Sequence, residues 1–263
     1  MTKMNNDSFN RSIRCLLAFL FIGWQLPMWG QAEGFKMGLA LDPNVAWMNS
    51  RDFEHTTEGL RAHFGYQFMA DILFTDTYAF GTGLHVFRTG SQVNYLEQVN
   101  DSTVQRVKQD LNNQYVELPL TFKMRTKEIG YTTYYGKFGA GVGMNTRREV
   151  DEVRTSAFER NEGVWATVND PVISAPDAVA DQEVSLFRAS MIVGLGFERR
   201  IAGSTAVMVG LTYNNSLFST HGDQTVVRVD ANGLPQGIND GLILTERMQG
   251  QDSFMALTVG LVF

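Results

Sequence analysis

Cysteine and long apolar runs are scarce in this chain. Cys15 is the only cysteine among the 263 residues, which excludes a disulfide framework and a cysteine-based metal site. After residue 32, no apolar run reaches the roughly 20 residues that a membrane-spanning helix needs. Stability must therefore come from packing and hydrogen bonds, and any membrane crossing would have to use strands closed into a barrel.

The first 32 residues have the pattern of a secretory signal peptide. Arg11 and Arg14 precede an apolar run that ends at Trp29, and small residues suited to cleavage follow. A single transmembrane anchor is the alternative, but the run is short and lacks flanking stop-transfer charges. We therefore expect residues 1–32 to be removed on export and residues 33–263 to form one domain.

Basic residues are fewer than acidic ones. The formal net charge is −6, and it would become −8 after cleavage, because the leader holds three basic side chains and one acidic side chain. Binding to nucleic acid depends on neutralising phosphates with Lys and Arg. An acidic exported chain is a poor candidate for that role, and we expect no nucleic-acid partner.

The C-terminal stretch alternates with a period of two, which indicates a strand with different surroundings on its two faces. Its apolar face holds Met255, Leu257, Val259, Leu261 and Phe263. The same alternation recurs, so that eight segments carry it: 35–42, 60–74, 78–87, 115–124, 134–145, 187–198, 207–214 and 253–263. In 60–74 the opposite face carries Arg61, His63 and Asp71, which suits a polar lumen.

These segments predict an all-β fold, an eight-stranded antiparallel up-and-down transmembrane β-barrel. A soluble sandwich or lipocalin-like barrel is the alternative, with its apolar face inside. Most glycines of these segments lie on the polar face, where small residues leave room for long charged side chains in a narrow lumen, and this favours the membrane barrel.

The connections between the segments alternate in length. Short ones are expected at 75–77, 125–133 and 199–204, and long ones at 49–59, 89–113, 147–184 and 217–252. Short periplasmic turns and long outer loops are typical of outer-membrane barrels. We therefore expect four long outer loops, with both chain ends on the short-turn side.

Charged side chains on the inward face predict a network inside the lumen. Its expected members are Lys36, Arg61, His63, Asp71, Glu117, Lys123, Lys137, Arg188 and Glu198. Each level of the barrel holds both signs, and eight strands leave a lumen about wide enough to be filled by side chains. We expect these charges to pair and plug the lumen; the alternative is a proton or ion path.

The sequence contains no HExxH, GxSxG or P-loop motif. We therefore expect no enzymatic activity, no metal site and no cofactor. Ser219, His221 and Asp223 have residue types suited to a nucleophile with a base, and a polar surface loop is the favoured interpretation. Apolar residues in the third long loop, Phe158 and Trp165 among them, mark either a partner surface or a loop that folds on itself.

One segment resembles a known motif. Tyr115–Lys123, which reads YVELPLTFK, resembles the Y-[LV]-E-[IL]-P-L-x-x-K segment of the outer-membrane β-barrel family common in the Bacteroidetes, often labelled PorT-like. Ile129–Gly139, Gly34–Leu39 and the final Phe263 are similar to that family as well. Pro119 would remove a ladder donor from a strand interior, so we expect a bulge or bend there.

The resemblance implies an integral outer-membrane protein of a Gram-negative cell, in contact with outer-membrane lipid. It also implies that Phe263 helps the barrel-insertion machinery to recognise the last strand, and it carries over no catalytic residue. We expect a structural or interaction role through the outer loops, with a secretion-system or surface partner. The alternatives are a PorT-like accessory component of type IX protein secretion, an outer-leaflet lipid-modifying enzyme and a small-solute porin.

Overall fold

The structure is a computed structural model of the chain. It describes residues 34–51, 56–161, 164–168, 173–175, 185–220, 225–236, 244–247 and 249–263. The expected signal peptide lies outside the described residues, so its removal stays a prediction. Within the described part of the chain, no helix has the length and apolar character needed to cross a membrane.

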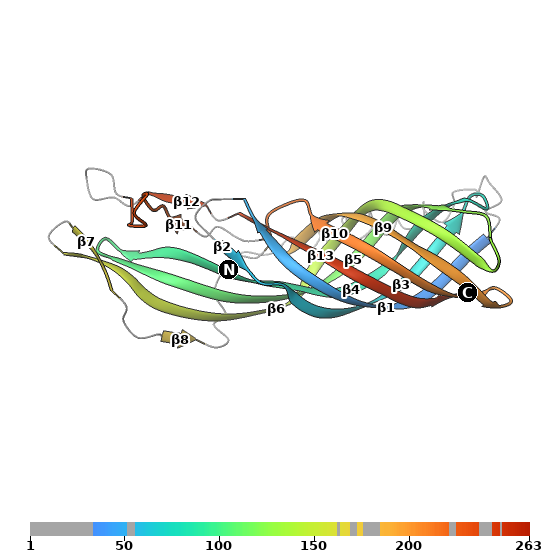
Figure 1. Cartoon of the computed structure of the whole chain (residues 1–263), viewed down its shortest axis with the longest axis horizontal. Helices are drawn as coiled ribbons and strands as arrows, with labels where there is room; N and C mark the ends of the chain where they lie inside the picture. The colour runs from blue at the N-terminus through green and yellow to red at the C-terminus, as the bar shows by residue number, and fades with distance from the viewer. Residues whose placement is uncertain are drawn as a thin grey trace, which may run out of the picture.

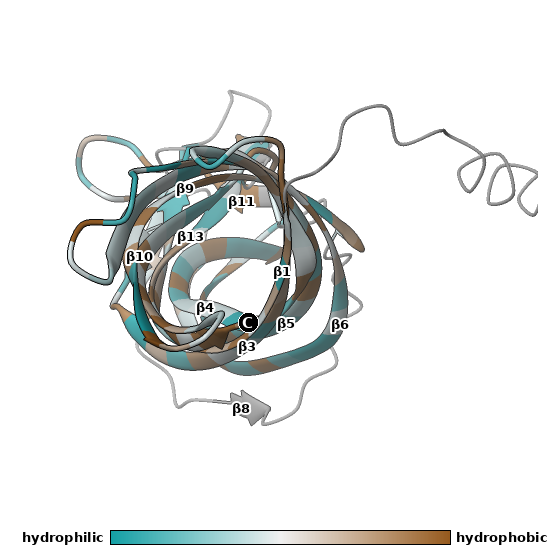
Figure 2. Cartoon of the chain, turned by 90° about the vertical axis from the view of Figure 1, so that its right-hand side faces the viewer, coloured by the Kyte–Doolittle hydropathy of each residue, from teal (hydrophilic) through white to brown (hydrophobic). Residues whose placement is uncertain are grey.

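Eight long strands close into a ring, seen end-on in Figure 2. They are β1 (Gly34–Ser50), β3 (Arg61–Leu73), β4 (Tyr78–Asn100), β5 (Thr103–Arg125), β6 (Thr132–Asn161), β9 (Phe187–Ala202), β10 (Thr205–Ser216) and β13 (Gly250–Val262). Each pairs antiparallel with the next ring strand along the chain, and β13 pairs with β1. The predicted eight-stranded antiparallel up-and-down barrel is confirmed.

The ring closes where the two ends of the described chain meet. The register runs from Gly38 opposite Val262 to Ser50 opposite Gly250. Beyond the strand, the Met37 and Phe263 backbones exchange two hydrogen bonds, of 2.9 and 2.8 Å. Phe263 therefore ends the closing strand, and its role in membrane insertion stays a prediction.

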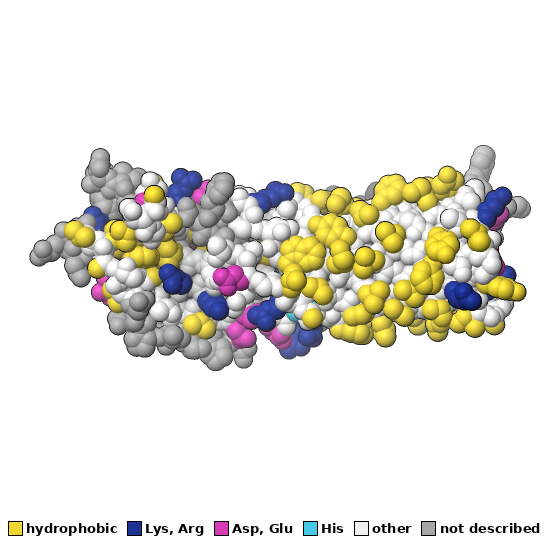
Figure 3. Space-filling view, viewed as in Figure 1, with side chains coloured by type: hydrophobic (Ala, Val, Ile, Leu, Met, Phe, Trp, Pro, Cys, Tyr) yellow, Lys and Arg dark blue, Asp and Glu magenta, His cyan; other side chains and the backbone are white. Residues whose placement is uncertain are grey.

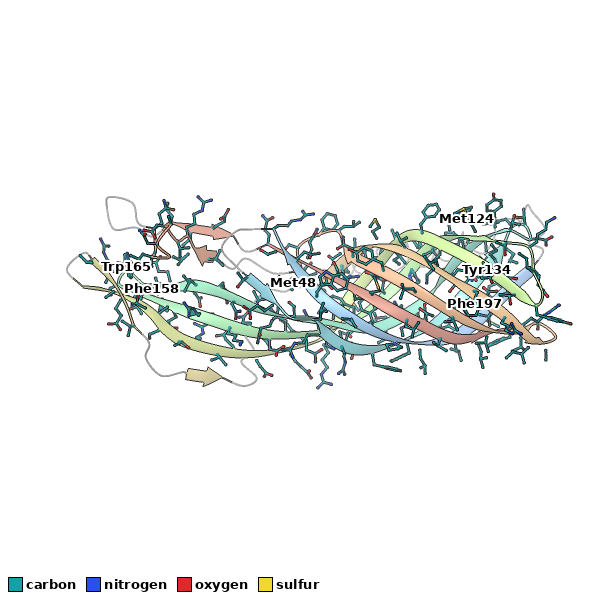
Figure 4. All side chains as sticks on the ribbon, viewed as in Figure 1. Met48, Met124, Tyr134, Phe158, Trp165 and Phe197 are labelled. Carbon is teal, nitrogen blue, oxygen red and sulfur yellow. The ribbon has the colours of Figure 1, made fainter. Side chains whose placement is uncertain are left out.

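An apolar band surrounds the barrel, because outward-facing positions carry large apolar side chains (Figure 3). Leu195 is 66% exposed, and Phe138 and Leu257 are exposed as well. Met124, Tyr134 and Phe197 belong to the same band near its short-turn end (Figure 4). Apolar patches of this extent are rare on monomers surrounded by water, whereas a bilayer covers them.

Three strands continue far beyond the ring as a curved sheet (Figure 1). Pairing between β4 and β5 extends to Asn100 opposite Thr103, and pairing between β5 and β6 extends to Thr103 opposite Glu159. We call this part, residues 88–100, 103–114 and 145–161, the arm. The predicted loop at 89–113 is wrong, and so is the first part of the loop at 147–184, because both are strand.

The reason for this error is that the side-chain pattern inverts where the arm begins. In the barrel, apolar side chains point outward; in the arm, Val93, Val107 and Leu111 point inward and are fully or almost fully buried. Polar side chains such as Lys108 take the outward positions. An inward apolar face is the pattern of a sheet that water surrounds, so the lipid-facing pattern used for the prediction does not apply in the arm.

Short strands complete the arm. β2 (Thr56–Glu58) pairs with β4, β7 (Val164–Thr167) and β8 (Ile173–Ala175) pair with β6, and β11 (Thr225–Val227) pairs with β12 (Thr245–Arg247). Val226 and Val227 of β11 are fully buried in two apolar clusters of the arm. The arm therefore has apolar clusters of its own, outside the barrel.

Pro119 interrupts a ladder without shifting its register. Gly81 opposite Thr121 and His85 opposite Glu117 keep one register, but the pairs between them are missing on the β4 side. Pro119 keeps its partner on β6, so the missing N–H is the one that would face β4. Of the expected bulge or bend, the bulge is therefore wrong, because the register is kept; the local effect is a short break in pairing, and the bend stays a prediction.

A substitution on the apolar band tests which solvent surrounds the barrel. We expect Leu195→Arg, in the middle of β9, to destabilise the protein by about 2–4 kcal/mol in lipid vesicles, because it places a charge in hydrocarbon. Val99→Arg is the matched control: Val99 is 51% exposed at the arm, and we expect a change within about 0.5 kcal/mol. Equal effects in urea unfolding would contradict a lipid-facing band.

Candidate functional site

Strand alternation directs every second side chain into the lumen, and the charged ones gather at two levels. We define the upper cluster, toward the arm, as Glu117, Arg188, Asn214 and Asp252. We define the lower cluster, toward the short turns, as Lys36, Asp71, Lys123, Arg125 and Glu198. A small cavity lies between the two clusters.

Arg188 is the centre of the upper cluster and is 2% exposed. Its Nη1 donates to Glu117 Oε2 at 2.8 Å, its Nε to Asp252 Oδ2 at 3.1 Å, and its Nη2 to Asn214 Oδ1 at 2.8 Å. Ser190 Oγ and Asn214 Nδ2 also donate to Glu117, at 2.7 and 2.8 Å. The cluster therefore connects β5, β9, β10 and β13 across the lumen.

Three buried aromatic rings surround the Arg188 guanidinium. Its central carbon lies 5.3 Å from the ring centroid of Phe87, 5.5 Å from that of Tyr115 and 6.0 Å from that of Phe254. Phe87 packs against the other two rings, at 4.6 Å from Phe254 and 5.8 Å from Tyr115. Cation–π contacts of this kind are strongest where water is excluded, and here all three rings are buried.

The lower cluster is centred on Glu198. Lys123 Nζ lies 2.7 Å from Glu198 and 2.6 Å from Asp71, while Arg125 Nη2 lies 2.7 Å from Glu198. Lys36 completes the cluster at 3.5 Å from Glu198. Three cations therefore contact one buried carboxylate, and Asp71 offsets part of the excess positive charge.

The cavity between the clusters measures about 40 Å³ and has Asp42, His85 and Lys137 in its lining. Asp42 Oδ2 lies 3.4 Å from His85 Nε2, and the Asp42 carboxylate faces this cavity. A water molecule needs roughly 10–15 Å³ by this measure and two to four polar partners. The cavity has room for a few water molecules, which would hydrate the Asp42 carboxylate.

The structure places the nine predicted lumen residues in three settings. Six belong to the two clusters: Lys36, Asp71, Glu117, Lys123, Arg188 and Glu198. Lys137 lines the cavity. Arg61 and His63 differ from the prediction: Arg61 forms an ion pair with Asp110 of the arm, and His63 lines a groove beside β4. They leave the lumen because β3 separates from β4 at this level.

Sequence reasoning missed several residues of the site. The sequence places Asp252 and Arg125 in connections between strands. Each side chain nevertheless continues the inward-facing alternation of the strand beside it. Asp42 and His85 were placed on inward faces but not among the network residues. Polarity could not identify the aromatic residues around Arg188, because Phe87 and Phe254 are apolar side chains like many others in the strands.

Phe158 and Trp165, proposed as an exposed partner surface, lie in an apolar cluster of the arm (Figure 4). Phe158 is 6% exposed and Trp165 packs against its cluster. The partner-surface interpretation is wrong for Phe158, because the segment folds back on β6 through β7. The alternative, a loop that folds on itself, describes this part of the chain.

The structure leaves the possible catalytic group open. Ser219 Oγ accepts a hydrogen bond from the Gly250 backbone N–H at 3.2 Å, while His221 and Asp223 lie outside the described residues. Among the described residues, no group of three or more His, Cys, Asp or Glu side chains could hold a metal ion. The chemistry that the described lumen supports is charge pairing.

Removing one partner of the upper cluster tests its energetic weight. We expect Glu117→Ala to destabilise the barrel by about 3–5 kcal/mol, because Arg188 would keep a buried charge with one carboxylate partner fewer. Glu128→Ala is the control: Glu128 pairs with Arg200 at 2.6 Å on the surface, and we expect about 0–1 kcal/mol. Equal losses in urea unfolding would show that the upper cluster is not tightly coupled.

A family model described as "Outer membrane protein beta-barrel domain" matches residues 29–212. No curated protein matches the chain.

Several solved structures are similar to the chain. Neisserial surface protein A (NspA) is 10% identical, with 87% of this chain and 95% of that chain covered and a TM-score of 0.39. Ail, the attachment invasion locus protein of Yersinia pestis, is 12% identical, with 87% and 98% covered and a TM-score of 0.34. The outer membrane protease OmpT from Escherichia coli is 8% identical, with 90% and 99% covered and a TM-score of 0.38.

Proposed function

We propose a structural and interaction role for this chain on the premise that it belongs to the outer membrane protein beta-barrel domain family, whose model matches residues 29–212. The family indicates an outer-membrane location. In our proposal the barrel anchors the arm, and the arm faces the cell exterior. The short turns, the start of β1 and the end of β13 then face the periplasm, after export by the N-terminal signal.

The folded arm is the observation that carries this proposal. Its strands continue those of the barrel, with one register shift between β5 and β6 at the junction. Val93, Val107 and Leu111 pack inside the arm with Val226 of β11. A surface built on paired strands loses little conformational entropy on binding, which favours recognition. The arm therefore suits a rigid platform for a partner.

The second part of the proposal is that side chains plug the lumen. The upper cluster and its three aromatic rings connect opposite walls, and their atoms are almost fully buried. The lower cluster crosses the lumen a second time. Eight-stranded barrels of this kind hold an interior that side chains can fill.

Conductance measurements test the plug. We expect the purified wild-type protein to give no steady single-channel current in planar bilayers, because in our proposal the two clusters of paired side chains fill the lumen. A large, stable current from the wild type would contradict the plug and favour the small-solute porin.

Photo-crosslinking tests the arm as an interaction surface. We expect a photoreactive amino acid in place of Lys108, which is exposed on the outward face of the arm, to capture one discrete partner in native outer membranes. The control position is Lys127, which is exposed in the short turn between β5 and β6. Crosslinks to lipid alone, or equal capture at both positions, would contradict the proposal.

The identity of the captured partner separates two versions of the proposal. A stoichiometric component of type IX secretion would support a PorT-like accessory role, which the Tyr115–Lys123 motif favours. A surface protein or glycan would support a stand-alone platform. In either version we propose that the chain has no enzymatic activity of its own.

A further inference from the structure

The barrel wall opens between β3 and β4 at the level where the arm begins. Pairing between these strands ends at Tyr66 opposite Val86, although β3 stays paired with β1 as far as Arg61. On that side β4 gains a new partner only at Gln92, where β2 begins to pair. Among the described residues, positions 87–91 of β4 therefore have no strand partner on that side.

A groove of about 470 Å³ lies at this opening. It is lined by Ala62, His63, Phe64, Tyr66, Val86, Phe87, Arg88 and Gln114. Its barrel side is apolar: Phe64 and Tyr66 are exposed members of the apolar band, next to Val86. Its arm side is polar and includes Arg88 and Gln114. The buried Phe87 ring, which also contacts Arg188, separates the groove from the lumen.

The polar side of the groove carries the positive charge of Arg88. Arg88 Nε donates to Gln114 Oε1 at 3.2 Å, and no carboxylate among the described residues pairs with Arg88. The neighbouring Arg61 is neutralised by Asp110. Gln114 therefore orients the Arg88 guanidinium while leaving its charge available.

In the proposed membrane orientation, the groove lies at the level where the hydrocarbon of the bilayer meets the lipid headgroups. Along the outward face of β4, Leu84 and Val86 belong to the apolar band, and Arg88 is the next outward position. Along β5, Gln114 follows Val116 in the same way. Charged side chains gather at this level in Figure 3, next to the apolar band. A molecule seated here would meet apolar and cationic surfaces within a single site.

We propose that this groove binds a phosphate-bearing lipid of the outer leaflet. The lipid phosphate contacts the Arg88 guanidinium, whose planar set of donors fits phosphate oxygens. An acyl chain follows the apolar side along Phe64, Tyr66 and Val86. The proposal uses the membrane orientation given above, but neither the plugged lumen nor a partner of the arm.

Native mass spectrometry of the detergent-solubilised full chain, titrated with purified lipid A, tests the groove. We expect one bound lipid per wild-type chain and a loss of at least about tenfold in affinity for Arg88→Gln. Ala62→Trp should weaken binding as well, because it fills the groove and keeps the charge. Heat-modifiable gel migration shows that each variant is folded.

Arg147→Gln is the matched charge control. Arg147 pairs with Glu149 at 2.6 Å on β6 and does not line the groove, so we expect wild-type binding. Equal losses for Arg88→Gln and Arg147→Gln would overturn the proposal in favour of diffuse attraction. Full binding by Ala62→Trp, or displacement of lipid A by equimolar inorganic phosphate, would overturn it too. Conductance and crosslinking do not depend on Arg88, so failure here leaves those tests intact.

Discussion

The pairing of β13 with β1 is the constraint on which the rest of the structure depends. In hydrocarbon, each unpaired backbone N–H or C=O costs several kcal/mol, so a sheet can cross a membrane only when it has no free edge. The seam from Gly38–Val262 to Ser50–Gly250 removes that edge. Closure then divides the side chains into two sets, one facing lipid and one confined to a narrow interior.

The confined set explains the two charge clusters. Charges inside the lumen have little water around them, so most of them pair with side chains on other strands. Arg188 reaches Glu117, Asn214 and Asp252 on three other strands. The same contacts connect the walls, so the interior stabilises the ring from within. Where β3 and β4 separate, Arg61 pairs outside the lumen with Asp110. On the outward face beside it, no carboxylate among the described residues pairs with Arg88.

The arm shows that the surroundings of a strand determine which of its two faces carries the apolar residues. β4 and β5 keep the same inward-facing alternation from the barrel into the arm, whereas β6 shifts its register by one residue opposite Gln114 and Tyr115. On β4 and β5 the apolar residues change from the outward to the inward face. The lipid-facing pattern therefore ends at residue 87 on β4 and begins again at residue 115 on β5. For that reason the sequence predicts a loop between these positions, although the structure has paired strands there.

The sequence by itself determined the number of barrel strands, their order, their inward and outward faces and six of the nine residues now found in the two clusters. It could do so because period-two alternation is a local property that survives without knowledge of neighbours. Only the tertiary structure decided that Asp252 and Arg125 join the clusters, that three aromatic rings surround Arg188 and that Arg61 leaves the lumen. These outcomes depend on register and on where two strands separate, and both are set by contacts between residues far apart in the chain.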